Sequence, residues 1–141
     1  MNFKMIGAAT ALVLFAAGSV SAATVNFAGT LKASDEVPAN TSAGTGDVKA
    51  SLDTATKVLT YTVNYSGLSG PAGAAHFHGL ADPGANAGPV VMVTVSPSPI
   101  KGTATLTDAQ IADLTAGKWY FNIHTAANRG GEVRAQLKAT K

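Results

Sequence analysis

The chain of 141 residues contains no cysteine, so disulfide bonds cannot stabilise it and thiolate metal ligands are excluded. Charged residues are also scarce, at 13% of the sequence. Alanine, glycine, threonine and valine dominate instead, which is typical of β-structure with tight turns and unlike the composition of disordered chains or long helices. The sequence is long enough to bury one hydrophobic core without covalent cross-links.

No hydrophobic run reaches the roughly 20 residues that a membrane-spanning helix needs. The nearest candidate is the apolar run at residues 5–18, which follows the positive charge of Lys4 and precedes small residues that end at Ala22. This order predicts a signal peptide over residues 1–22, cleaved after Ala22. A membrane anchor and a buried N-terminal helix are the alternatives. We expect residues 23–141 to form one periplasmic or secreted domain without a membrane span.

The expected mature chain has almost no net charge, because nine basic residues remain against eight acidic ones once Lys4 is removed. A basic surface of the kind that binds nucleic acid or an anionic membrane is therefore not indicated. The sequence lacks the Gly-x-Ser-x-Gly turn of serine hydrolases. No helix is expected after Gly130-Gly131, so this pair indicates a turn rather than a phosphate-binding loop.

Alternation of apolar and polar residues predicts about eight β-strands. The clearest case is Val58–Tyr65, where Thr60, Thr62 and Asn64 alternate with apolar or aromatic residues. Val90–Val95 is apolar throughout, so we expect a strand that is buried on both faces. The predicted strands are Thr24–Lys32, Gly46–Leu52, Val58–Tyr65, Ala74–Gly79, Val90–Val95, Ile100–Leu106, Trp119–Thr125 and Glu132–Lys138.

One short helix is predicted between the sixth and seventh strands. Thr107 and Gln110 have the spacing of a capping box, and Gly117 marks the end of the helix. The fold class that follows is an all-β, Greek-key, immunoglobulin-like β-sandwich of about eight strands with one short helix.

The last two predicted strands form a hairpin around residues 126–131, with one face in the core and one face outward. Tyr120 and Asn122 share the outward face with His124, either as pocket residues or as ordinary cross-strand partners. The residues expected in the core are Trp119, Phe121, Ile123, Val133, Ala135 and Leu137, and those expected outward on the second strand are Glu132, Arg134 and Gln136.

All three histidines of the chain lie in predicted strands. His76 and His78 are two residues apart, so both imidazoles face the same side of the sheet, opposite the expected core side. Joined by His124 from another strand, they would form a three-nitrogen metal site with an open fourth position, the pattern of a reactive centre. Copper is favoured, with zinc as runner-up, because divalent affinities peak at copper. The alternative is that the histidines steady loops through hydrogen bonds.

Three carboxylates are candidates for a fourth ligand or for a partner that orients a ligand histidine. These are Asp35, Glu36 and Glu132. Each has a simpler interpretation: Asp35 and Glu36 can cap loop backbone, and Glu132 can pair with Arg134 or Arg129 on the surface, where such pairs contribute about 0–1 kcal/mol.

Several motifs occur in a fixed order along almost the whole expected mature chain. They lie at residues 36–38, 75–79, 83–84, 88–91, 120–125 and 131–137. In sequence and spacing they resemble the CHRD domain family, which is found in chordin and in many secreted microbial proteins. The resemblance implies an immunoglobulin-like sandwich with a distant similarity to copper/zinc superoxide dismutase, and it implies no particular activity.

Through that similarity, the three histidines look like three of the four copper-binding imidazoles of the dismutase. Arg134 is similar in position to the arginine that steers anions there. This chain has no fourth histidine to bridge copper and zinc, no cluster of zinc ligands and no disulfide pair. A copper/zinc dismutase is thereby excluded, whereas a mononuclear site is not.

Three hypotheses on function follow. The first is a secreted binding or structural module of the cell envelope with a mononuclear copper site at His76, His78 and His124. The second is a mononuclear copper enzyme of the superoxide dismutase type. The third is a metal-free module that binds an unknown protein partner, for example by strand addition at a sheet edge.

Overall fold

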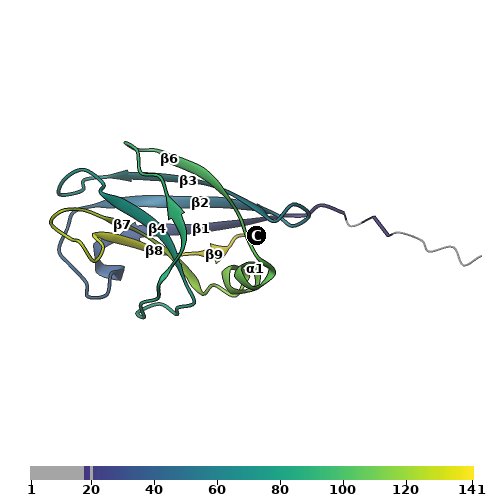
Figure 1. Ribbon diagram of the computed structural model, residues 1–141. Helices are drawn as coiled ribbons and strands as arrows, with labels where there is room; N and C mark the ends of the chain where they lie inside the picture. Colours follow the sequence, from purple (N-terminus) through teal and green to yellow (C-terminus); the bar gives the residue numbers. More distant parts are fainter. Residues whose placement is uncertain (1–17, 20) are drawn as a thin grey trace, which may run out of the picture.

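The computed structural model describes residues 18–19 and 21–141, so most of the predicted signal peptide lies outside the described residues (Figure 1). The described part is almost entirely β-structure, with one short α-helix, α1 (Asp108–Thr115), and one 3-10 turn, η1 (Ala33–Asp35). No helix of the described part is long and apolar enough to cross a membrane. The strands are β1 (Thr24–Lys32), β2 (Thr45–Asp53), β3 (Val58–Ser66), β4 (Ala74–Gly79), β5 (Pro89–Val93), β6 (Ile100–Thr105), β7 (Trp119–His124), β8 (Val133–Gln136) and β9 (Lys138–Ala139).

The strands form one antiparallel sheet in the order β5-β4-β7-β8-β1-β2-β3-β6, and the short β9 pairs with β1. The sheet folds over so that β1, β2, β3 and β6 form one layer and β4, β7 and β8 lie across it in a second layer (Figure 1). The two layers are joined where β1 meets β8 and β9. The predicted all-β sandwich is therefore confirmed, and β9 is an additional strand.

Aromatic side chains from both layers meet in the core. Phe77 of β4 packs edge-on against Tyr61 of β3, with ring centroids 5.0 Å apart, and against Phe121 of β7 at 4.9 Å. Phe77 and its neighbour two residues earlier, Ala75, have no exposed surface. Since side chains alternate along a strand, the even-numbered residues of β4, including His76 and His78, must face away from this core.

The predicted helix and its cap are confirmed. The Thr107 hydroxyl accepts a hydrogen bond from the backbone N–H of Gln110 at 3.2 Å, and the Gln110 side chain accepts one from the N–H of Thr107 at 2.9 Å. Leu114 is buried, and Gly117 has a φ of 75°, the left-handed conformation that ends many helices. The helix thus closes one end of the sandwich as its sequence indicates.

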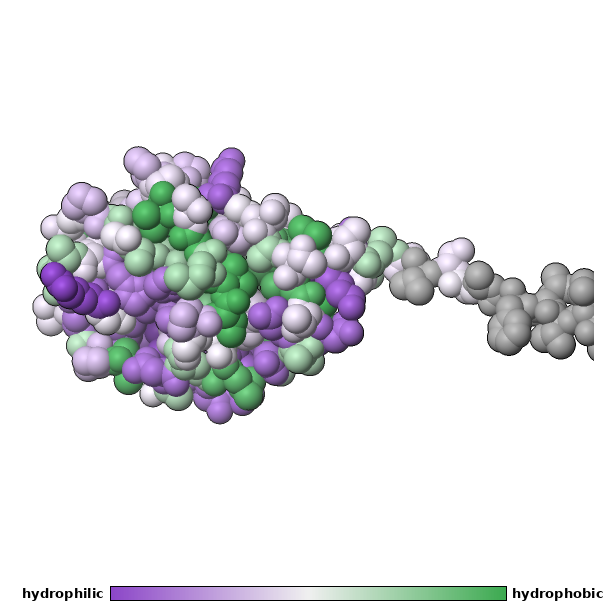
Figure 2. Space-filling view, viewed as in Figure 1, coloured by the Kyte–Doolittle hydropathy of each residue, from purple (hydrophilic) through white to green (hydrophobic). Residues whose placement is uncertain are grey.

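The prediction that the strand at residues 90–95 is buried on both faces is wrong. Strand β5 lies at one end of the sheet, pairs only with β4, and has no buried residue. Met92 is 71% exposed on this strand, and Figure 2 shows hydrophobic side chains gathered on the face where β5 lies. An apolar run does not distinguish a strand covered on both faces from an edge strand with apolar residues on its outer face.

Glu132 and Arg134 alternate with core residues and face outward as predicted, but two loops cover them. Glu132 and Arg134 are 0% and 1% exposed. Asn40, from the segment after η1, donates a hydrogen bond to the carbonyl of Glu132, and Arg134 donates to the carbonyl of Ala85 in the segment between β4 and β5. The outer face of β7 and β8 is therefore a second buried layer, polar in character, beneath these loops.

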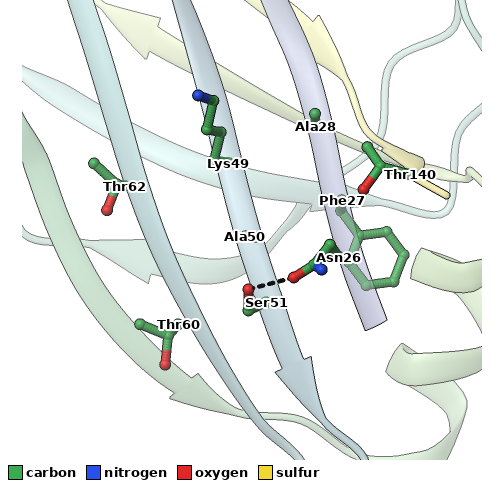
Figure 3. Close-up of a pocket in the computed structure, with 9 residues that line it drawn as sticks. All are labelled: Asn26, Phe27, Ala28, Lys49, Ala50, Ser51, Thr60, Thr62 and Thr140. Carbon is green, nitrogen blue, oxygen red and sulfur yellow. Dashed lines mark hydrogen bonds between the residues drawn. The ribbon is translucent and has the colours of Figure 1, made fainter. Parts of the chain in front are cut away.

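The outer face of the other layer remains open to solvent. A shallow hollow of about 430 Å³ lies over β1, β2 and β3 (Figure 3). Its polar lining includes Lys49, Thr60 and Thr62, and Ser51 donates a hydrogen bond to Asn26. It lies on the layer that carries none of the histidines, which are on β4 and β7 of the other layer.

Candidate metal centre

Strands β4 and β7 bring the three predicted histidines together. The register pairs Ala74 with His124, His76 with Asn122 and His78 with Tyr120. All three imidazoles project from the side of these strands opposite the core, as the two-residue period predicts. One ring nitrogen from each histidine lies within 4.8 Å of the others, the only such group of potential metal ligands among the described residues.

The ring nitrogens of His76 and His124 lie close enough together to bind one metal ion. The Nδ1 atom of His76 lies 3.2 Å from the Nε2 atom of His124. Two nitrogens bound to one tetrahedral metal at about 2.0–2.1 Å are roughly 3.4 Å apart, so the observed separation fits a shared ion. The second nitrogen of His124, Nδ1, donates to the carbonyl of Arg129 at 2.8 Å, which leaves a lone pair on Nε2 when the ring is neutral.

His78 is buried, at 7% exposure, and both of its ring nitrogens have partners. Nδ1 donates to the carbonyl of Ala87 at 2.9 Å, and Nε2 lies 2.8 Å from the side-chain Oδ1 of Asn122. The ring also stacks on Tyr120, with centroids 4.6 Å apart and planes 2° from parallel. His78 can therefore act as a ligand through Nε2 only if it separates from Asn122.

The electrostatics of the cluster favour neutral imidazoles. Burial lowers the pKa of His76, and the neighbouring His124 and His78 lower it further. Burial also lowers the pKa of His78, although its hydrogen bonds to Ala87 and Asn122 oppose this effect. Neutral imidazole carries the lone pair that a metal ion requires.

Arg134 does not reach solvent, so it does not occupy the anion-steering role that the resemblance implied. Its guanidinium carbon lies 3.5 Å from the centre of the Tyr120 ring, and it donates to the carbonyl of Ala85 at 2.7 Å and to Asn86 at 3.1 Å. The Tyr120 hydroxyl also binds this loop, donating to the carbonyl of Ala87. Arg134 and Tyr120 thus hold the loop between β4 and β5 over the site.

Glu36 lies beside Asn122, and Asn122 separates it from His78. It is 5% exposed, and its Oε1 atom has no hydrogen-bond partner. A Cβ atom at Gly131 would lie 2.3 Å from this oxygen and 2.6 Å from Nδ2 of Asn122, so the carboxylate and the amide meet over a position that only glycine can occupy. Burial raises the pKa of Glu36 to about 7, although Asn122 and Arg134 oppose the shift. Asp35, by contrast, is exposed.

Glu132 fastens loops together and does not pair with an arginine, contrary to the surface interpretation. Its carboxylate accepts hydrogen bonds from the hydroxyls of Ser42, Ser69 and Thr125 and from the backbone N–H of Ser69 at 2.7 Å. Burial alone would raise its pKa, but these donors lower it to about 2. The serines lie in loops far away in the sequence, where no local pattern could have identified them.

The sequence left Asn122 open as either a pocket residue or an ordinary cross-strand partner, and did not indicate its contacts with His78 and Glu36. The alternating position of Asn122 on β7 places it on the same face as His124, but an ordinary cross-strand partner would occupy the same position. Only the structure shows that its amide lies between His78 and Glu36, and that it is 2% exposed.

Comparison with known proteins identifies the family and nothing further. No curated protein and no solved structure gives a match. The distant likeness to copper/zinc superoxide dismutase therefore stays a prediction. The model of the CHRD domain matches residues 27–137, which include most of β1, all of β2 to β8 and all three histidines. The chain therefore belongs to the CHRD domain family.

Proposed function

We propose that this protein is an exported CHRD-domain binding module with a mononuclear metal site formed by His76, His78 and His124. The observation that carries the proposal is the 3.2 Å separation between Nδ1 of His76 and Nε2 of His124. That distance also suits a simple hydrogen bond between the rings. The third imidazole within 4.8 Å, and the fixing of His124 through its other nitrogen, support the metal.

Copper(II) is the proposed ion, with zinc as runner-up. The ligand set is all nitrogen, and imidazole suits both ions. The divalent affinity order places copper above zinc for the same ligands. His76 and His124 are partly exposed, so an ion has access to their nitrogens from solvent.

The chain's own residues would orient the ligands. The carbonyls of Arg129 and Ala87 accept from Nδ1 of His124 and Nδ1 of His78, so in each ring Nε2 is the nitrogen left to bind a metal. Stacking on Tyr120 further restricts the His78 ring. Such partners fix ring orientation and typically contribute 10- to 100-fold to metal affinity.

Titration calorimetry of the purified protein with Cu(II) and Zn(II) tests this proposal. We expect one ion per chain, and a loss of affinity greater than about 100-fold in His76→Ala and in His124→Ala, because removing a ligand costs more than removing its outer partner. Lys49→Ala, exposed on the opposite layer, is the matched control and leaves affinity unchanged. Uptake that is equal in all variants would refute the site.

Export is the second part of the proposal, and it is supported by the charge, apolar run and small residues at positions 1–22. Mass spectrometry of the protein recovered from the producing cells tests it. We expect a chain that begins at Ala23. A chain that keeps its first 22 residues would contradict cleavage.

A further inference from the structure

Asn122 holds His78 by the one ring atom that a metal would need. Because the carbonyl of Ala87 only accepts hydrogen bonds, Nδ1 of His78 carries a hydrogen, and Nε2 carries the free lone pair of the neutral ring. The Asn122 amide lies 2.8 Å from this Nε2 atom. An imidazolium would donate to Oδ1, and a neutral ring would accept from the NH2 group after a half-turn of the amide. The amide occupies Nε2 in both cases.

The other end of the Asn122 amide is held as well. Its Nδ2 atom and the unpartnered Oε1 of Glu36 meet at the α-carbon of Gly131, where no side chain separates them. A charged Glu36 can accept a hydrogen bond from Nδ2, and a protonated Glu36 can donate one to Oδ1 after the half-turn. The pKa of about 7 for Glu36 makes both forms accessible near neutral pH. Asn122 is therefore fixed between an acid and His78 in either orientation.

The three histidines are consequently not equivalent. His76 and His124 present their nitrogens to each other with no other side chain between them, whereas His78 lies in a buried hydrogen-bond chain. We propose that Asn122 is a latch on the metal site: it positions His78 in the metal-free protein, and His78 joins the site only by exchanging Asn122 for the metal. This inference rests on the proposed function, since it assumes that His76 and His124 bind an ion.

The latch sets the strength and reversibility of metal uptake. Binding begins at His76 and His124, and the gain from His78 is reduced by the hydrogen bond that must be broken. The net contribution of one such bond corresponds to a roughly 2- to 12-fold change in affinity. The return of His78 to Asn122 would likewise assist release, which suits a site that exchanges its ion with a partner or with solution.

Calorimetry with Zn(II) on the wild type, Asn122→Ala, His78→Ala and the double variant tests the latch. We expect Asn122→Ala to bind Zn(II) roughly 2- to 12-fold more tightly than the wild type, and His78→Ala to cost more in the Asn122→Ala background than in the wild type. Asn64→Ala, which removes an exposed asparagine on β3, is the matched control and changes nothing. Equal affinities of wild type and Asn122→Ala would overturn the latch and leave the three-histidine site standing.

A second measurement keeps the latch testable if Asn122→Ala fails to fold. In the wild type, nitrogen NMR follows the side-chain amide of Asn122 and Nε2 of His78 during titration with Zn(II). We expect both signals to move together and to return when a chelator removes the ion. Zinc binding that shifts the His76 and His124 nitrogens while both signals stay fixed would overturn the latch. No binding in any variant would overturn the proposed function, and the latch with it.

Discussion

Replacing Glu132 with glutamine tests how strongly one buried carboxylate holds the loops of this domain. The side chain is 0% exposed and accepts four hydrogen bonds, from Ser42, Thr125 and two groups of Ser69. Glutamine keeps the size of the side chain but removes the charge. It can still accept from the N–H of Ser69, and the hydroxyls can turn to accept from its NH2 group.

The magnitude follows from the pKa of Glu132. Its pKa falls from 4.5 to about 2 on folding, and one pKa unit corresponds to about 1.4 kcal/mol, so the charged form stabilises the fold by about 3 kcal/mol. Because the folded-state pKa is the lower one, this contribution is fully present above pH 4.5 and is lost as the pH falls through 2.

The assay is urea unfolding at several pH values between 7 and 2, followed by the fluorescence of the buried Trp119. We expect Glu132→Gln to be about 3 kcal/mol less stable than the wild type at pH 7, and the two free energies of unfolding to converge near pH 2. Asp35→Asn, which changes an exposed carboxyl group, is the control and stays parallel to the wild type. Asp53 also has a lowered pKa, caused by hydrogen bonds from Thr56 and Ala55, but it contributes equally to both proteins.

A difference between wild type and Glu132→Gln that is the same at pH 7 and at pH 2 would refute the reasoning. It would mean that the effect comes from packing and not from the charge. Thr125→Ala, which removes one of the four donors, is expected to show about a third of the effect with the same dependence on pH.

Three further predictions concern the buried polar layer and the metal site. Glu36→Gln removes an acid whose folded-state pKa is raised from 4.5 to about 7. The acid's stabilising contribution is present below pH 4.5 and lost as the pH rises through 7, so the variant should match the wild type at pH 4.5 and exceed it by about 3 kcal/mol at pH 8 in urea unfolding. An equal difference at both pH values would contradict this. Gly131→Ala places a Cβ atom 2.3 Å from Glu36 at a φ of 130°, so it should lose at least about 2 kcal/mol in the same assay, whereas Gly130→Ala, which meets open space, should lose less than half as much. Zn(II) at 100 times its Kd should stabilise the wild type by about 2.7 kcal/mol in thermal melting, reversed by a chelator and absent in His76→Ala; a shift retained in that variant would place the ion elsewhere.

The sequence predicted the parts of the fold that repeat with a fixed period. Ala75 and Phe77 lie in the core, and His76 and His78 lie on the opposite face, because a strand allows no other arrangement of neighbours. The convergence of His124 on this pair required only that β4 and β7 be adjacent. The capping box at Thr107 was recognised for a similar reason, since both of its partners lie within one helical turn.

The loops that cover the site could not be predicted, because loop sequences show no periodic pattern of apolar and polar residues. Arg134 alternates with core residues and looks solvent-exposed in the sequence, yet it is buried by hydrogen bonds to a loop almost fifty positions earlier. Ser42 and Ser69 are 90 and 63 positions away from the Glu132 carboxylate that they bind. Nothing local marks these pairs, and the roles of Asn122 and Glu36 emerge only from such contacts.

The hydrogen bonds to Glu132 determine the solution conditions in which the loops of this domain stay in place. A small domain that depends on disulfide bonds needs an oxidant to form them, and it is destabilised when free thiols reduce them. Here the loops are held by hydrogen bonds from hydroxyl and backbone N–H groups to a carboxylate, so they need no oxidant to form and do not depend on the redox state of the surroundings. The weakness of this arrangement is strong acid, the one condition that neutralises the group at its centre.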